Sequence, residues 1–263
     1  MTLILAYANP QFAIMAADRR ITRGVVLETD KQTKMAIWEG SLMFSYTGLA
    51  EIGVEREDTI SVLAKILAEQ KKFNPLPIAD LFKQKIDEMV ISRKDKRLAI
   101  LGVGFNDLGK TVYWIISNTY GHGGKVLNEA TDSFQILYNL PITDSSTQVY
   151  GLNSNLNYKA RNNLLTRLRQ TRGTSLPSEG AIMNILGGAI SDSAGPTVSR
   201  ESLVCTMFRD VRIRSVSTIK GQHNKPGAIV DFATPLIIKN GGIISMPQQR
   251  LRVARKKRPR SRY

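Results

Sequence analysis

The first fifty residues place a threonine, an aspartate, a lysine and a glycine at spacings that could form a reaction centre. Thr2 follows the initiator Met1, and a small second residue allows the methionine to be removed. Removal would leave one residue with both a hydroxyl nucleophile and a free α-amine, a group that titrates near about pH 8. That amine could take the proton of its own hydroxyl. The residue types therefore predict attack on a carbonyl carbon by Thr2.

Three further residues fit supporting roles in this chemistry. The ammonium group of Lys34 would lower the pKa of the Thr2 amine, and Asp18 would pair with Lys34. Gly48 follows a strand-like run, and its bare backbone would let the N–H group approach a developing oxyanion closely. We therefore interpret these four residues as the candidate catalytic group.

Short strands must position these residues. An apolar, β-prone run over residues 1–7 meets a turn at Asn9-Pro10 and returns over residues 12–17. Two such runs predict a β-hairpin, with Thr2 at one end and Asp18 near the other. A further strand-like run over residues 41–46 leads towards Gly48.

This stretch resembles the β-type subunits of the proteasome and the related peptidase of a bacterial two-component protease, which are N-terminal-nucleophile hydrolases. At fixed separations this family places the nucleophile, an aspartate, an arginine two residues past it, a substrate-backbone binder, a lysine and an oxyanion-hole glycine. In the same order, the matching positions here are Thr2, Asp18, Arg20, Thr22, Lys34 and Gly48. The resemblance implies those roles for them.

The resemblance is thinner in the second half of the chain. Family members carry a serine in a glycine-serine-glycine turn, where this chain has Leu152. They also carry an aspartate with a serine three residues on, and here Asp192 matches the aspartate while Gly195 replaces the serine. Asp192 therefore stays a candidate supporting residue, and its hydroxyl partners do not align.

The resemblance also implies a substrate pocket beside Thr2. Its lining would be Ile21, Gln32, Ala36, Tyr46 and Ala50. Because the Tyr46 side chain would occupy volume, we expect a small or restricted side chain on the acyl side of the cut bond. The implied substrate is a peptide or an unfolded protein. The implied assembly is a self-compartmentalised, homo-oligomeric ring, with an ATPase unfoldase as a candidate partner.

The composition argues against membrane-spanning, disulfide-linked and metal-binding classes of protein. The chain has 263 residues, with 42% hydrophobic and 22% charged content, as in ordinary globular proteins. No apolar run reaches the length of a membrane-spanning helix. The single cysteine, Cys205, precludes an internal disulfide and fits a reducing, cytoplasmic compartment, where we expect it buried and inert. His122 and His223 are too isolated to indicate a metal site, and no cofactor is predicted.

The net charge of +15 is concentrated at the C-terminal end. The last fourteen residues hold eight Lys and Arg residues and no acid, which leaves +7 for the rest of the chain. We expect one hydrolase domain over residues 1–246 and a basic tail without ordered core elements over residues 247–263. The tail would be solvated, or would contact nucleic acid, acidic lipid or an acidic partner. Base stacking on the tail has no support, because only Tyr263 is aromatic.

The order of elements predicts the fold class. Strands are followed by two helices, more strands, two further helices and final strands. The expected helices cover residues 60–68, 78–89, 157–172 and 179–192. This order predicts an α+β fold, a four-layer αββα sandwich of two antiparallel sheets between helical layers, which the resemblance also implies.

One further motif matches a nucleotide-binding pattern by its letters. Residues 104–111 read G-x-x-x-x-G-K-T, which binds phosphate where a helix follows the loop. Here a β-branched and aromatic run over residues 111–116 follows, so we expect a strand, with Asn106–Gly109 as a hairpin turn.

Four alternatives to the threonine-peptidase interpretation stay open. Residues 1–17 could be a secretory signal, although they lack a basic start and Asn9-Pro10 interrupts the apolar run. Asp18 and Lys34 could be an ordinary surface ion pair. The chain could also be a non-catalytic ring or scaffold subunit that binds an anionic partner through its tail, or a narrow amidase on the same fold.

Overall fold

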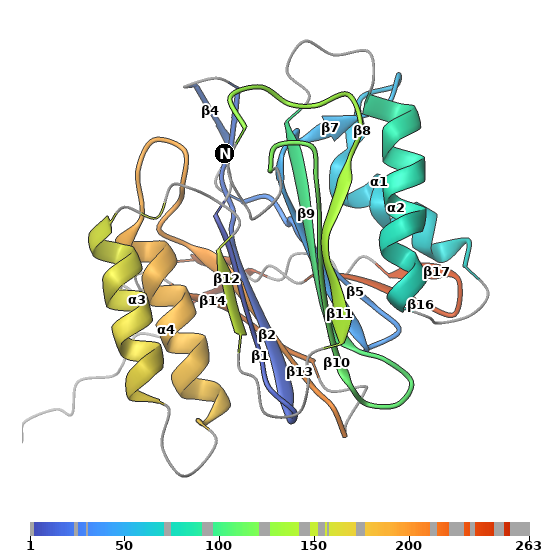
Figure 1. Ribbon diagram of the computed structural model, residues 1–263. Coiled ribbons are helices and arrows are strands. Elements are labelled where there is room, and N and C mark those ends of the chain that lie inside the picture. Colours follow the sequence, from blue (N-terminus) through green and yellow to red (C-terminus); the bar gives the residue numbers. More distant parts are fainter. Residues whose placement is uncertain are drawn as a thin grey trace, which may run out of the picture.

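A computed structural model of the chain shows a mixed α/β protein (Figure 1). The described part contains four helices, which are α1 (Thr59–Ala68), α2 (Pro75–Val90), α3 (Tyr158–Gln170) and α4 (Glu179–Asp192). The structure describes residues 3–23, 26–29, 31–70, 75–90, 97–120, 127–141, 148–151, 156, 158–171, 177–210, 215–220, 229–231, 235–244 and 250–252.

Two larger sheets form the centre of the molecule. The first is entirely antiparallel and contains, in spatial order, β12 (Gln148–Gly151), β1 (Ile4–Ala8), β2 (Phe12–Asp18), β13 (Ser202–Phe208) and β14 (Ser215–Lys220). The second contains β11 (Gln135–Pro141), β10 (Thr111–Ser117), β9 (Leu98–Phe105), β6 (Leu42–Gly48), β5 (Met35–Trp38), β16 (Leu236–Lys239) and β17 (Gly242–Ile244).

The prediction of two antiparallel sheets is wrong for the seven-stranded sheet. Strand β16 pairs with β5 in parallel, with Leu236 opposite Ala36, so this sheet is mixed. The cause is long-range: the last part of the chain returns to the edge of a sheet that was built from residues 35–141. No local pattern in either strand fixes that direction.

Three short two-stranded sheets complete the described strands. They pair β3 (Ile21–Arg23) with β4 (Val26–Thr29), β7 (Glu51–Ile52) with β8 (Glu57–Asp58), and β15 (Ile229–Asp231) with β18 (Arg250–Arg252). Strand β18 lies within the expected basic tail, in a two-stranded sheet apart from the two larger sheets. Residues 247–249 and 253–263 of the tail lie outside the described residues, as do His122 and His223.

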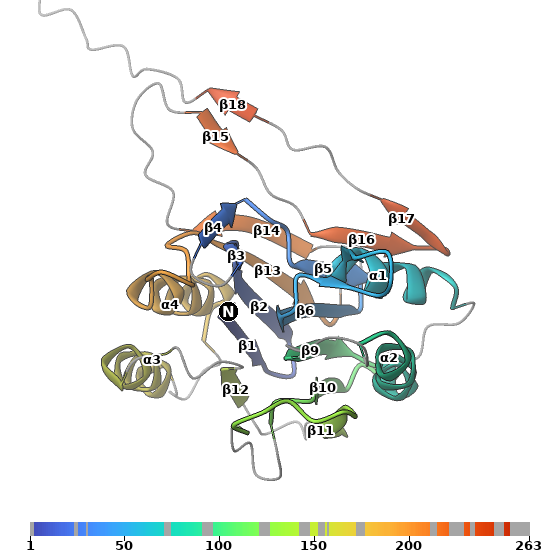
Figure 2. The ribbon, with the colours of Figure 1, turned by 90° about the horizontal axis from the view of Figure 1, so that it is seen from above.

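The apolar core divides into three clusters. One joins the seven-stranded sheet to α1 and α2 through Phe44, Phe82 and Trp114, and another joins the five-stranded sheet to α3 and α4 through Ile14 and Leu186. The third lies between the sheets, with side chains from β1, β2, β13 and β5, β6, β9 and β10. Figure 2 shows the two helix pairs on the outer faces. Strands covered on both faces explain the continuous apolar runs in the sequence.

The hairpin predictions are confirmed. Strands β1 and β2 pair antiparallel around a turn in which the Asn9 side chain accepts hydrogen bonds from the N–H groups of Gln11 and Phe12, both at 2.8 Å. The G-x-x-x-x-G-K-T segment joins β9 to β10 through a turn in which Asn106 accepts the Lys110 N–H at 2.9 Å. A strand follows the turn, so this segment is no phosphate-binding loop.

Among the described helices, none combines the length and the apolar character needed to cross a membrane. Cys205 is buried in β13, and burial raises the pKa of its thiol. The helix prediction over residues 179–192 is confirmed at both ends, and Ser178 caps its start by accepting the Ala181 N–H at 3.3 Å.

Candidate active site

The end of strand β2 brings together two of the four predicted catalytic residues, Asp18 and Lys34. In the β1–β2 hairpin, Ile4 lies opposite Ala17, and the Asp18 N–H donates to the Leu3 carbonyl at 3.1 Å. The Asp18 carboxylate accepts the Leu3 N–H at 2.6 Å through Oδ2. Thr2, the predicted nucleophile, lies outside the residues that the structure describes. Asp18 is therefore bonded to the residue that follows Thr2 in the chain.

The second partner of Asp18 is Lys34. Its Nζ lies 3.5 Å from Asp18 Oδ1, and both side chains are almost fully buried. The same ammonium donates to the carbonyl of Arg20, and the Ser45 hydroxyl fixes the Lys34 backbone by donating to its carbonyl at 2.7 Å. The alternative of a surface ion pair is wrong, because this pair is removed from solvent.

Burying a carboxylate and an ammonium is costly unless both are well bonded. Besides Lys34, Asp18 accepts the Leu3 N–H and the Arg20 N–H, the latter at 2.8 Å. Burial raises the pKa of Asp18, and the charge of Lys34 and the backbone hydrogen bonds oppose that rise without cancelling it. The result is a shielded acid–base pair whose charges act across a medium of low polarity.

Gly48 ends strand β6, and its backbone explains why a glycine stands there. Its φ angle is +108°, and an added Cβ would lie 2.0 Å from the Arg97 carbonyl oxygen of the neighbouring chain segment. Leu49 donates to that same carbonyl at 2.9 Å. The residue is exposed, on the strand next to β5, which directly follows Lys34. Any other residue would displace the β6–β9 contact.

Arg20 links the end of β2 to the segment that follows α4. Its guanidinium donates to the carbonyls of Gly195 and Pro196, the latter at 3.2 Å. The backbone N–H of Arg20 bonds to Asp18 at the same time. Asp192, the last residue of α4, is exposed, and its side chain makes no hydrogen bond or ion pair to other described residues. The backbone of Arg20 therefore bonds to both members of the Asp18–Lys34 pair, whereas no such bond links Asp192 to the pair in the described residues.

The predicted substrate-binding residues divide between surface and core. Ile21 and Thr22 on β3, Gln32 and Ala50 are half-buried. Ala36 and Tyr46, by contrast, are 0% and 1% exposed and belong to the core cluster beneath α1 and α2. These two side chains could therefore form only the buried base of a pocket.

Tyr46 carries a buried hydroxyl with no hydrogen-bond partner among the described residues. Burial raises the pKa of this phenol well above its ordinary value, and the nearby carboxylates of Asp58, Asp18 and Glu51 raise it further. The hydroxyl therefore stays protonated and can only act as a neutral donor or acceptor.

Two residues at the start of α1 contact the candidate site but were not predicted as site residues from the sequence. Asp58 caps the helix and accepts the Gln32 side-chain amide at 3.1 Å, and Thr59 donates through its hydroxyl to the Leu49 carbonyl at 2.8 Å. The signal for the cap was present, since Asp58 stands two residues before the periodic run Ile60–Ala68. The bond to Gln32 spans twenty-six residues and had no local signal.

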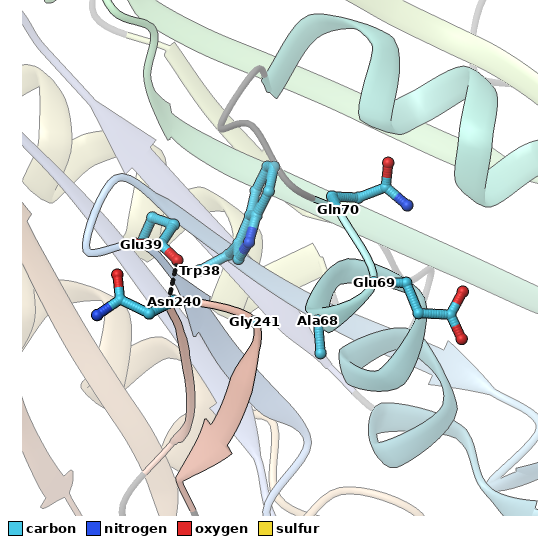
Figure 3. Close-up of a pocket in the computed structure, with 7 residues that line it drawn as sticks. All are labelled: Trp38, Glu39, Ala68, Glu69, Gln70, Asn240 and Gly241. Carbon is cyan, nitrogen blue, oxygen red and sulfur yellow. Dashed lines mark hydrogen bonds between the residues drawn. The ribbon is translucent and has the colours of Figure 1, made fainter.

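No group of three or more His, Cys, Asp or Glu residues that could hold a metal occurs in the described part of the chain. A cavity of about 470 Å³ lies at the C-terminal end of α1 (Figure 3). It is lined by Trp38, Glu39, Ala68, Glu69, Gln70, Asn240 and Gly241. None of these is a predicted site residue, so this cavity is not the predicted substrate pocket.

Comparison with known proteins found no match, so the functional proposal rests on the sequence and on the site geometry. No family model matches the chain, and no curated protein matches it.

Proposed function

We propose that this chain is a threonine-type peptidase in which Thr2, once Met1 is removed, hydrolyses peptide bonds. The observation that carries the proposal is the buried Asp18–Lys34 pair, with the Asp18 carboxylate bonded at 2.6 Å to the N–H of Leu3. That N–H belongs to the peptide bond between Thr2 and Leu3. Chain connectivity therefore keeps Thr2 within one peptide unit, about 3.8 Å between Cα atoms, of a residue held by Asp18.

The arrangement of the core supports the fold that this function requires. One apolar cluster packs α1 and α2 against the seven-stranded sheet, and a second packs the two sheets against each other. A third packs the five-stranded sheet against α3 and α4. We infer a four-layer αββα sandwich of the N-terminal-nucleophile hydrolase type. In such a sandwich the β1–β2 hairpin and strand β6 would present Thr2 and Gly48 at one edge.

The reaction proceeds in two stages in this proposal. The Thr2 hydroxyl transfers its proton to the neutral α-amine while its oxygen bonds to the substrate carbonyl carbon. The Gly48 N–H stabilises the oxyanion, and the protonated amine then gives its proton to the leaving nitrogen as the C–N bond breaks. This leaves an ester on Thr2. Water attacks the ester with the amine again as base, and the acid product leaves as the Thr2 hydroxyl is restored.

Lys34 acts on this reaction through charge. An ammonium close to the α-amine lowers the pKa of that amine, which increases its neutral fraction near pH 7. Asp18 holds Lys34 in place and compensates for its burial. The half-buried Thr22 on β3 would bind the substrate backbone. The proposed setting is a cytoplasmic, proteasome-like homo-oligomeric ring that takes unfolded protein, with an ATPase unfoldase as a candidate partner.

A second candidate rests on the charge of the C-terminal run. Eight cations in the last fourteen residues favour contact with an anionic partner, as in a non-catalytic ring or scaffold subunit. Retained Met1 would fit that candidate, because the threonine amine would then be an amide and unable to act as a base. A narrow amidase would use the same Thr2 chemistry on a smaller substrate.

The mass of the intact purified protein separates these candidates. The peptidase and amidase predict a mass that lacks one methionine residue, and the scaffold subunit is compatible with full length. Turnover of fluorogenic peptide amides then distinguishes the peptidase from the amidase. Retention of Met1, or turnover that Thr2→Ala leaves unchanged, would contradict the proposal.

A further inference from the structure

The start of helix α1 connects two segments that the proposed function places on either side of the substrate. Asp58 is the helix cap, and its Oδ2 accepts the N–H of Ser61 at 3.2 Å and the Ser61 hydroxyl at 2.8 Å. Its other oxygen, Oδ1, accepts the side-chain amide of Gln32 at 3.1 Å. A single carboxylate therefore has two separable tasks, one within the helix and one across to the Lys34 segment.

Thr59, the next residue, makes the contact to the opposite segment. Its N–H donates to the Ala50 carbonyl at 2.9 Å, and its hydroxyl donates to the Leu49 carbonyl at 2.8 Å. Thr59 is fully buried, so both bonds are shielded from water. The residues that follow Gly48 are thereby fixed to the first turn of α1.

Gln32 has a second anchor on the catalytic side. Its backbone N–H donates to the Arg19 carbonyl at 3.1 Å, and Arg19 follows Asp18 directly. Gln32 also precedes Lys34 by two residues. The path from Asp18 through Arg19 and Gln32 to Asp58 thus crosses from the five-stranded sheet to the helix that covers the other sheet.

We propose that Asp58 is a positioning residue of the substrate site, which sets the place of Gln32 relative to the Leu49–Ala50 segment. The inference rests on the proposed function, because only that function makes these segments the walls of a substrate groove. Asp58 acts through Gln32 and has no part in bond making or breaking. Its removal therefore weakens substrate binding and leaves the maximal rate little changed.

Two substitutions remove the bond between Asp58 and Gln32 and keep the helix cap. Asp58→Ser keeps a good capping residue but is too short to reach Gln32 as well. Gln32→Leu removes the same bond from the other side and leaves the cap intact. Asp58→Asn retains both functions, because its oxygen caps the helix and its amide donates to a rotated Gln32. Glu57→Gln is the matched control, since it removes one negative charge from the adjacent residue.

The measurement is steady-state hydrolysis of an alanine-containing tripeptide aminomethylcoumarin amide by the full-length protein. We expect Asp58→Ser and Gln32→Leu each to raise KM about fivefold, as the loss of one hydrogen bond allows, with kcat within about twofold of wild type. The double variant should resemble the single variants, because both remove the same bond. Asp58→Asn and Glu57→Gln should keep the wild-type KM.

The outcomes separate this inference from the proposed function. A wild-type protein that hydrolyses the peptide while Asp58→Ser and Gln32→Leu keep its KM would overturn the inference alone. The same holds for equal KM effects in Asp58→Ser and Asp58→Asn, or for additive effects in the double variant. A wild-type protein without Thr2-dependent hydrolysis would overturn the proposed function and, with it, the role of Asp58.

Discussion

Asp18 and Lys34 face one another at 3.5 Å, with 0% and 1% of their side chains exposed to solvent. A buried pair of this kind rarely adds stability over an apolar pair of equal volume, because both charges lose their hydration. Under the proposed function, its position follows from its chemical role rather than from stability. Three hydrogen bonds of its side chains reach the backbone at residue 3, just before β1, and at residue 20, just after β2.

Replacing Lys34 with Met should remove activity and reduce stability. The α-amine of Thr2 would lose the nearby positive charge, so we expect peptide hydrolysis to fall about a hundredfold or more. The free energy of unfolding at neutral pH should fall by about 3 kcal/mol, because the Asp18 carboxylate loses its counter-charge. Urea denaturation and peptide turnover test this, with the exposed Lys31→Met as control. Near-wild-type hydrolysis by Lys34→Met would contradict the assigned role.

The raised pKa of Asp18 predicts a particular dependence of stability on pH. The folded protein keeps this proton over a range where the unfolded chain has already lost it, from the ordinary value of 3.8 upward. The unfolded state therefore binds fewer protons there, and the contribution of Asp18 to stability falls as the pH rises through that range. The unfolding free energy of wild type minus that of Asp18→Asn should therefore decrease as the pH rises above 3.8. An increase would mean that the folded pKa lies below 3.8.

Gly48→Ala tests the close backbone approach at the end of β6. The substitution adds a Cβ at 2.0 Å from the Arg97 carbonyl oxygen, at a φ of +108°. We expect a loss of about 3 kcal/mol or more in unfolding free energy, together with loss of hydrolysis. Gly53→Ala is the matched control, since Gly53 has a φ of +78° and open space around its Cβ position. That variant should lose only about 1 kcal/mol. Equal losses of unfolding free energy in the two variants would show that the close approach to the Arg97 carbonyl does not contribute to the effect of Gly48→Ala.

Tyr46→Phe should leave the protein equally stable or more stable. The substitution removes a buried hydroxyl that has no hydrogen-bond partner in the described part of the chain. Relieving an unsatisfied polar group should raise the unfolding free energy by up to about 1 kcal/mol, measured by urea denaturation. A loss of similar size would show that the hydroxyl has a partner.

The burial of Tyr46 and Ala36 also predicts substrate choice. Both side chains fill the volume beneath the predicted pocket, so a small side chain on the acyl side of the cut bond should be preferred. Fluorogenic peptides that differ only at that position measure the preference through kcat/KM. A preference for a large aromatic side chain would contradict this account of the pocket.

Local features of the fold could be predicted from the sequence because local interactions determine them. The Asn9 turn and the Asn106 turn are fixed by side chains that bond to the backbone within four residues. Helix α4 follows from an apolar face and from Ser178 at its start. The β-branched run after Lys110 correctly predicts a strand where the letters alone match a phosphate-binding loop.

Features that depend on distant segments could not be predicted in this way. The parallel pairing of β16 with β5 joins residues two hundred positions apart, and nothing in either strand encodes its direction. The bond between Asp58 and Gln32 arises only when the first turn of α1 meets the segment before Lys34. At the candidate site, the spacing correctly predicted that Asp18 and Lys34 meet. The exposed position of Asp192 instead depends on how α4 lies on the five-stranded sheet.

The most direct test of the central claim is covalent trapping with a peptide epoxyketone, a reagent that reacts with both the hydroxyl and the free amine of an N-terminal threonine. Peptide mapping by mass spectrometry locates the adduct. We predict an adduct on the N-terminal peptide that begins with Thr2, and none in Thr2→Ala. An unmodified N-terminal peptide in a correctly folded protein, or an adduct elsewhere in the chain, would contradict the assignment of Thr2 as the nucleophile.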